Sequence, residues 1–341
     1  MSALKVLRIG PAVTIQDMGR PGLLGQGVSQ GGAADVRALA EGAALLAQPV
    51  THAALEMAGM GGDFQATAPL RIALTGAVMS ASIDGERVSW NASHLLGVGQ
   101  TLSIGAARRG VYGYLHLGGG INSPVLLGAR AVHQSAGLGH AILAGDEIPV
   151  GPDSGSEIGL VLAVTPRFDG GELRIVESFQ SALFSQAIRD RFAGTVFQRG
   201  SRANRMGVEL VSEGVGFSAE GQLNILSEVI TPGDVQMTGD GKPFVLLREC
   251  QTTGGYPRIG TVLPCDLPRI AQAQPGASLR FNWVTLDEAL AAEERFAKEI
   301  KDLRRACQPL VRDPADIADL LAYQLVGGVI SAKADPFEKE S

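Results

Sequence analysis

Residues 250–262 read Cys-Gln-Thr-Thr-Gly-Gly-Tyr-Pro-Arg-Ile-Gly-Thr-Val, and this stretch says more about the chain than any other. It follows an apolar run at residues 244–247 that predicts a buried strand. The adjacent Gly254 and Gly255 can adopt positive φ, so that their N–H groups point toward one anion or carbonyl oxygen. The polar donors of the turn belong to Gln251, Thr252, Thr253, Tyr256 and Arg258. We therefore expect the turn to bind a ligand, although Gly and Pro also mark ordinary tight turns.

Three more glycine-flanked blocks precede this turn. Residues 14–22 read Thr-Ile-Gln-Asp-Met-Gly-Arg-Pro-Gly, residues 114–121 read Tyr-Leu-His-Leu-Gly-Gly-Gly-Ile, and residues 201–207 read Ser-Arg-Ala-Asn-Arg-Met-Gly. In content and in order, the four blocks resemble the allophanate hydrolase subunit 2 family, which includes the C subunit of 5-oxoprolinase and the carboxyltransferase region of urea carboxylase. The resemblance covers roughly residues 4–285.

The distribution of Gly, Pro and short apolar runs indicates the same fold class as the resemblance. The chain has 341 residues, of which 45 are Gly and 17 are Pro, and these punctuate short apolar runs as in a β-rich protein. The resemblance implies two cyclophilin-like β-barrel domains, which we place at residues 1–160 and 172–285. We expect a mainly β (β-rich α+β) fold with few helices and a helical extension and tail at residues 286–341. The helices are expected at residues 33–46, 184–192, 286–306 and 315–325.

Charge and hydropathy argue against several classes of protein. The net charge of −6 disfavours a nucleic-acid-binding surface, which is normally basic. No apolar stretch approaches the roughly 18–20 residues of a membrane span, and the start of the chain carries no apolar signal segment. Three widely spaced cysteines form neither a metal motif nor a disulfide framework. We therefore expect a cytoplasmic protein that binds neither nucleic acid nor membrane.

Four sequence features that could indicate a catalytic or ligand-binding site are not supported by the residues around them. Residues 27–31 match the Gly-x-Ser-x-Gly pattern of a serine nucleophile, but a Gly- and Pro-rich segment precedes Ser29 where that motif needs a strand. Pro243 occupies the position at which a phosphate loop needs Ser or Thr. The five histidines lack metal-ligand spacing, so we predict no metal site and a structural role for His116. Cys250 is expected to be a small buried residue rather than a nucleophile.

Polar clusters beside glycines supply the candidate site. Asp17 and Arg20 are the predicted catalytic pair, because a carboxylate can hold or deprotonate an amide nitrogen and a guanidinium can bind a carboxylate. The alternative is that the two side chains pair with each other and pin their loop. Asn204 stands where the family usually has Asp, which puts acid–base work at this position in doubt. The predicted substrate-binding residues are Gln16, Asp35, Asn204, Arg205, Gln251, Thr252, Thr253, Gly254, Gly255 and Tyr256.

The loop that carries the predicted catalytic pair and the turn at residues 250–262 are expected to lie close together in space. Ligand sites favour domain interfaces, where the loops of two packed β modules are available. We therefore predict one polar cleft shared by residues 16–20 and the turn at residues 250–262. In that cleft, Arg20→Ala should damage activity more than stability. Gly254→Val should abolish function because a β-branched residue resists positive φ.

Three functions are compatible with the sequence. The first, implied by the resemblance, is the C subunit of an ATP-dependent 5-oxoprolinase, which opens 5-oxo-L-proline to L-glutamate. Its expected partners are a smaller protein resembling allophanate hydrolase subunit 1, which is the B subunit of 5-oxoprolinase, and also the A subunit of that enzyme. The second is an allophanate hydrolase or urea carboxylase type of carboxyltransferase subunit that acts on urea-like amides. The third is a non-catalytic regulatory binding subunit.

Cofactor use follows from what the sequence contains. The chain has neither a nucleotide loop nor a biotin-attachment Met-Lys-Met, so no covalently bound cofactor is expected. ATP would be used by the assembled complex. Biotin would be needed only by a carboxyltransferase, and another domain or protein would carry it. We therefore expect the isolated chain to be inactive and its ligand to be a small molecule with amide and carboxylate groups.

Overall fold

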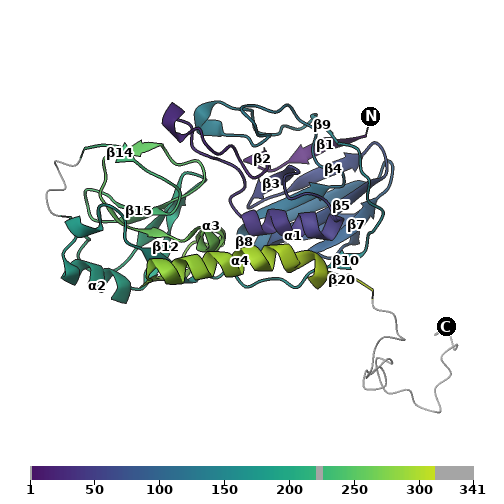
Figure 1. The fold of residues 1–341 in the computed structure, drawn as a ribbon. Coiled ribbons are helices and arrows are strands. Elements are labelled where there is room, and N and C mark those ends of the chain that lie inside the picture. Colours follow the sequence, from purple (N-terminus) through teal and green to yellow (C-terminus); the bar gives the residue numbers. More distant parts are fainter. Residues whose placement is uncertain (1, 220–225, 312–341) are drawn as a thin grey trace, which may run out of the picture.

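The computed structural model describes residues 2–219 and 226–311, which form two β units side by side (Figure 1). A long helix, α4 (Leu286–Ala306), lies across both units. The mainly β fold predicted from the sequence is confirmed. The helix expected at residues 315–325 lies outside the described residues. Within the described ranges, no helix is long and apolar enough to cross a membrane.

The first unit, here called the N-terminal domain, is built on an eleven-stranded sheet. Its main path runs β20-β10-β7-β5-β8-β4-β1-β9, and β2, β3 and β6 pair beside this path. Two long antiparallel strands, β5 (Leu70–Ile83) and β8 (Thr101–Leu117), form its centre. The other strands are β1 (Ala3–Ile9), β2 (Val13–Gln16), β3 (Ala54–Ala58), β4 (Gly62–Ala66), β6 (Glu86–Arg87), β7 (Ala92–Leu96), β9 (Glu147–Pro149), β10 (Leu160–Val161) and β20 (Gln308–Pro309).

The second unit, here called the C-terminal barrel, closes into a ring of seven strands in the order β11-β18-β15-β16-β13-β12-β19. The N-terminal sheet, in contrast, keeps two ends, at β20 and β9. A two-stranded ribbon of β14 and β17 accompanies the barrel. The strands are β11 (Gly171–Val176), β12 (Phe197–Ala203), β13 (Gly207–Val211), β14 (Glu228–Val229), β15 (Asp234–Met237), β16 (Pro243–Leu246), β17 (Thr253–Gly254), β18 (Arg258–Val262) and β19 (Ser278–Trp283).

Local sequence signals explain several of these elements. Asp84 and Gly85 both have positive φ and turn β5 into β6, as Asp-Gly does in a tight hairpin. Helix α4 begins with a capping box, in which the side chains of Thr285 and Glu288 bond to each other's backbone N–H groups. Helix α3 (Leu267–Gln272) was not predicted, because six residues are too few to show a helical period.

One hydrophobic core cluster spans both units, and a separate cluster fills the N-terminal domain. Helix α1 (Val36–Leu46), whose first turn is capped by Asp35, contributes Leu39 to the core cluster that contains Phe192 and Phe281 of the barrel. Helix α2 (Gln186–Gly194) supplies Phe192, which stacks on Phe281 at 4.7 Å between ring centroids. Because one core spans the boundary, the loops at that boundary have fixed partners on both sides.

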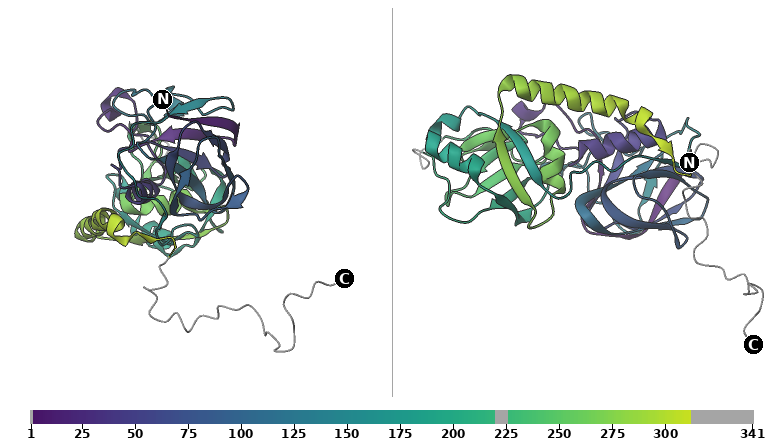
Figure 2. Two further views of the ribbon diagram at one scale, coloured as in Figure 1. Left: turned by 90° about the vertical axis from the view of Figure 1, so that its right-hand side faces the viewer. Right: turned by 90° about the horizontal axis from the view of Figure 1, so that it is seen from below.

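Helix α4 lies on the outside of the two units and helps to hold them together. Figure 2 shows it lying along both units, from the barrel to the N-terminal domain. Glu299 of α4 accepts a hydrogen bond from Arg37 of α1 at 2.8 Å, and Arg304 donates to the carbonyl of Ala44 at 3.2 Å. Strand β20 then pairs with β10 and returns the chain to the N-terminal sheet.

Candidate functional site

The predicted catalytic residues lie in the seam loop, which we define as residues 16–35, from the last residue of β2 to the start of α1. Asp17 is only 7% exposed. One of its carboxylate oxygens accepts the N–H of Gly19 at 2.8 Å, and the other accepts the N–H of Arg130 at 2.6 Å. The carboxylate is therefore held by backbone donors, an arrangement that fixes a loop.

Arg20 is almost completely buried, at 1% exposed. It donates to the carbonyl of Leu126 at 3.3 Å and to that of Ala131. Burial lowers the pKa of Arg20, and the negative charges of Asp17 and Glu249 oppose that shift. Among the ion pairs of the described residues, Arg20 does not pair with Asp17. The alternative interpretation was therefore right that Arg20 pins a loop but wrong about its partner.

Gly19 and Gly32 let two parts of the seam loop approach each other closely. Gly19 and Gly32 have φ of 79° and 83°. A Cβ on Gly32 would lie 2.7 Å from the backbone nitrogen of Gly19, and 2.8 Å from the carbonyl oxygen of Asp17. Beside them, Gln16 is fully buried and donates to the carbonyl of Val132 at 3.0 Å. The close approach that these glycines permit is used in internal packing.

Arg205 of the barrel reaches across to the seam loop. Its Nε donates to Glu249 at 2.6 Å, one terminal nitrogen bonds Glu56 of the N-terminal domain, and the other donates to the carbonyl of Gly32 at 2.6 Å. Burial alone would lower the pKa of Arg205, but the carboxylates of Glu56 and Glu249 raise it above its ordinary value. Glu56 also accepts the hydroxyl of Tyr114 at 2.6 Å. Each of the three guanidinium nitrogens of Arg205 thus has a partner within the protein.

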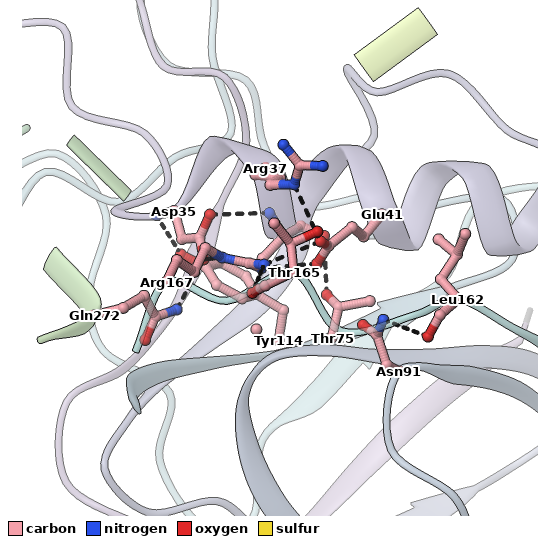
Figure 3. Close-up of polar contacts among 12 residues, drawn as sticks. Asp35, Arg37, Glu41, Thr75, Asn91, Tyr114, Leu162, Thr165, Arg167 and Gln272 are labelled. Carbon is pink, nitrogen blue, oxygen red and sulfur yellow. Dashed lines mark hydrogen bonds and ion pairs between the residues drawn. The ribbon is translucent and has the colours of Figure 1, made fainter. Parts of the chain in front are cut away.

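Asp35 belongs to a second buried network at the boundary between the two units, a region here called the seam (Figure 3). Its side chain caps α1 by accepting the N–H of Ala38 at 3.0 Å. The same carboxylate accepts Arg167 at 2.7 Å and the amide of Gln272 at 2.9 Å. Arg167 also clamps Glu41 with bonds of 3.0 and 2.7 Å. The structure therefore places Asp35 in a network that joins α1, the connection between the units and α3.

Ser29 has a partner that the sequence did not reveal. Its hydroxyl lies 2.8 Å from Nε2 of His133, and both residues are at most 3% exposed. Nδ1 of the same ring accepts the N–H of Ala136 at 3.3 Å. This assigns the ring proton to Nε2, which then donates to Ser29. A histidine that activates a serine must instead accept its proton, so the pair does not form a nucleophile.

The C-terminal barrel carries an open pocket of about 630 Å³, here called the barrel pocket. Its volume lies in the range of small-molecule sites. The lining combines apolar side chains with a few amide, hydroxyl and guanidinium groups. The lining residues are Ser201, Arg202, Ala203, Asn204, Met206, Gly207, Ile230, Gln236, Thr238, Phe244, Leu246, Cys250, Gln251 and Tyr256.

Gln236 is the most informative residue of the barrel pocket, and sequence reasoning missed it. It is 8% exposed, and its Nε2 is buried with no hydrogen-bond partner among residues 2–219 and 226–311. A buried amide donor without a partner costs free energy, which a ligand oxygen would recover. The available signal was a polar residue between the apolar Val235 and Met237 of the buried strand Asp234–Met237.

The turn at residues 250–262 lies beside Gln236. Gln251 and Tyr256 line the pocket, whereas Thr253 and Gly254 form β17. The expected positive φ of Gly254 is wrong, because its backbone is outside that region. The glycine is needed for another reason: a Cβ there would lie 2.6 Å from Nε2 of Gln236.

The predicted site residues are therefore divided between two places. Asn204, Gln251 and Tyr256 line the barrel pocket, and Thr252, Thr253, Gly254 and Gly255 belong to the turn beside it. None of the predicted seam-loop residues is among the lining residues of that pocket. The barrel pocket therefore does not contain both groups, as the predicted shared cleft would require. Gln16, Asp17, Arg20, Asp35 and Arg205 lie in the buried seam.

Two further lining residues set the chemistry of the pocket. The guanidinium of Arg202 lies 5.2 Å from the ring centroid of Phe244 and pairs with Glu209 at 2.6 Å. Burial raises the pKa of the Cys250 thiol to about 12, with the charge of Asp234 adding to the shift. Cys250 is thus a neutral thiol at pH 7, consistent with the expected apolar role.

Comparison with known proteins identifies the family. The sequence pattern of the carboxyltransferase domain, subdomains A and B, matches residues 26–283. The chain belongs to this carboxyltransferase domain family. It is 31% identical over 298 residues to the C subunit of 5-oxoprolinase from Escherichia coli, covering 85% of this chain and 94% of that protein. It is 30% identical over 308 residues to the corresponding C subunit from Haemophilus influenzae, covering 89% and 98%.

A solved structure supports the fold of this family member. The crystal structure of urea carboxylase from Kluyveromyces lactis superimposes with a TM-score of 0.80 at 20% sequence identity. The match covers 92% of this chain and 31% of the urea carboxylase chain. The carboxyltransferase fold predicted from the sequence motifs is thereby confirmed.

Proposed function

We propose that this chain is the C subunit of an ATP-dependent 5-oxoprolinase, and that its barrel pocket binds the lactam substrate. The observation that carries the proposal is the buried, unpartnered amide of Gln236 in an otherwise mixed polar and apolar pocket. The two relatives named as the C subunit of 5-oxoprolinase, each matched over nearly its whole length, support the choice of substrate.

The chemistry of 5-oxoproline suits the lining of this pocket. The lactam offers a carbonyl oxygen and an N–H group, the ring offers two CH₂ groups, and a carboxylate is attached beside the nitrogen. Gln236 donates to the lactam oxygen, while Phe244 and Leu246 pack against the ring. The amide of Gln251 and the phenol of Tyr256 contact the remaining polar atoms, and Arg202 attracts the carboxylate.

The partners follow from the same proposal. This chain supplies a substrate pocket but no nucleotide loop, so ATP is handled together with a protein resembling allophanate hydrolase subunit 1 and with the A subunit of the enzyme. The seam loop holds the two units in register, and residues 16–35 act on the pocket through Arg205 and Glu249 rather than on the substrate.

The test is glutamate release from 5-oxo-L-proline, measured with ATP for the chain alone and for the chain reconstituted with its two candidate partner proteins. We expect release only from the complex, and none when this chain is omitted. Release that is independent of this chain overturns the proposal. Turnover of a urea-like amide by the same complex, with no glutamate release, assigns the chain to the carboxyltransferase function instead.

A further inference from the structure

A second cavity lies between the two units rather than in the barrel. It has a volume of about 210 Å³ and lies where α1, the connection at residues 165–167, α3 and α4 meet. None of its lining residues belongs to the barrel pocket. Five guanidinium groups and two carboxylates line it: Arg37, Arg167, Arg174, Arg269, Arg295, Asp266 and Glu299.

Three of these arginines have carboxylate partners. Arg167 is held by the buried seam carboxylates already described. Arg174 forms a two-pronged pair with Asp266, with a closest distance of 2.6 Å. Arg37 pairs with Glu299 at 2.8 Å. Both carboxylates that line the cavity are therefore already engaged by arginines.

The other two arginines have no such partner. Neither Arg269 of α3 nor Arg295 of α4 has a carboxylate within 4.0 Å in the part of the chain that the structure describes. Arg269 donates one terminal nitrogen to the carbonyl of Gly170 at 2.9 Å, and its Nε is buried without a hydrogen-bond partner among the described residues. The cavity thus presents two arginines without a carboxylate partner and one buried N–H donor without an acceptor.

We propose that this cavity binds a small oxyanion of the phosphate type, held by Arg269 and Arg295. The planar fork of arginine matches two oxygens of a phosphate, and the limited volume favours a small anion over a large one. The anion joins α3 of the barrel region to α4, which itself contacts α1 of the N-terminal domain. Its binding therefore stabilises the arrangement of the two units.

Calorimetric titration of the full chain with inorganic phosphate, at constant ionic strength maintained with chloride, tests this inference. We expect saturable binding by the wild type and a melting temperature that rises with phosphate concentration. Arg269→Gln and Arg295→Gln should each weaken phosphate affinity about tenfold or more, because each removes a charged hydrogen bond.

Arg108→Gln is the matched control, since Arg108 is exposed and lies outside this cavity. It should bind phosphate as the wild type does. Arg295 is exposed, so its variant should fold even if Arg269→Gln does not. No saturable binding by the wild type overturns the proposal, as does equal affinity in wild type and Arg295→Gln.

A second titration identifies the source of the phosphate group. If ADP or ATP binds more tightly than phosphate and loses affinity in Arg295→Gln, the site takes the phosphate end of a nucleotide. If nucleotides bind no more tightly than phosphate, the ligand is free phosphate. Both results support an oxyanion site, whereas nucleotide binding that is unaffected by Arg295→Gln and accompanied by no phosphate binding contradicts it.

Discussion

The seam loop and the turn at residues 250–262 are alike in sequence and unlike in structure. Both are glycine-flanked and rich in amides, hydroxyls and charges. In the seam loop, Asp17 and Arg20 are buried and bonded to backbone groups of their own domain. In the turn, Tyr256 is 50% exposed and lines a pocket beside the unpartnered amide of Gln236. Nη1 of Arg20 is also buried without a partner among the described residues, but Arg20 does not line this pocket, whereas Gln236 does. Polar composition beside glycine therefore marks a site only where a polar atom without a partner also lines an open pocket.

The difference has an energetic meaning that variants can test. Charges buried in the seam stabilise the fold only while their partners remain, because an uncompensated buried charge is costly. Polar groups lining the barrel pocket contribute little to the fold, since several of them, such as Gln251 and Tyr256, are exposed to solvent. Substitutions in the seam should therefore change stability, and substitutions in the pocket should change substrate binding.

The largest effect is expected from Arg205→Ala in the seam. The variant leaves Glu56 and Glu249 buried without their cation, which should lower the free energy of unfolding by about 3–5 kcal/mol. Chemical denaturation measures this change. Arg305→Ala is the control, because Arg305 is 87% exposed and its pair with Asp302 should contribute less than about 1 kcal/mol. Similar losses in both variants would remove the distinction between seam and surface.

Gly42→Ala should have the next largest effect. Alanine normally favours a helix over glycine by about 1 kcal/mol. At this position in α1, however, its Cβ would lie 2.2 Å from the ring of His116, and overpacking a core costs about 1–3 kcal/mol. Gly194→Ala in α2 is the control, since nothing lies within 4 Å of that Cβ. Thermal denaturation that shows Gly42→Ala to be as stable as Gly194→Ala would contradict tight packing of α1 on His116.

The elements that were predicted correctly are those whose signals are local. The helix at residues 286–306 was predicted from its period, and the structure has α4 at Leu286–Ala306. The site was predicted less well because its contacts are remote in sequence. Asp17 finds its donor at Arg130, 113 residues away, and Arg205 finds Glu56 149 residues away. A sequence shows which side chains are polar, but it does not show which of them are already satisfied.

The pH dependence of the free energy of unfolding provides a third test, through the buried His116 that packs against α1. His116 is fully enclosed, and burial lowers its pKa to about 3, although a backbone interaction with Ala38 opposes this. The unfolded chain takes up a proton below pH 6.5, whereas the folded chain does not, so stability should fall as the pH falls from 6.5 toward 3. The slope from this residue should be about 1.4 kcal/mol per pH unit. His116→Gln should lack that part of the slope, and identical pH profiles would contradict the assignment.

The most direct test of the division between seam and pocket compares Gln236→Leu with Arg20→Met in the reconstituted complex. For each chain, the melting temperature is measured first, and then the dependence of glutamate release on 5-oxoproline concentration. Gln236→Leu should keep its melting temperature and raise KM about 2- to 10-fold, with kcat little changed, because it loses one neutral hydrogen bond to the substrate. Arg20→Met should lower the melting temperature and leave KM unchanged. A raised KM in Arg20→Met, together with an unchanged KM in Gln236→Leu, would contradict the account.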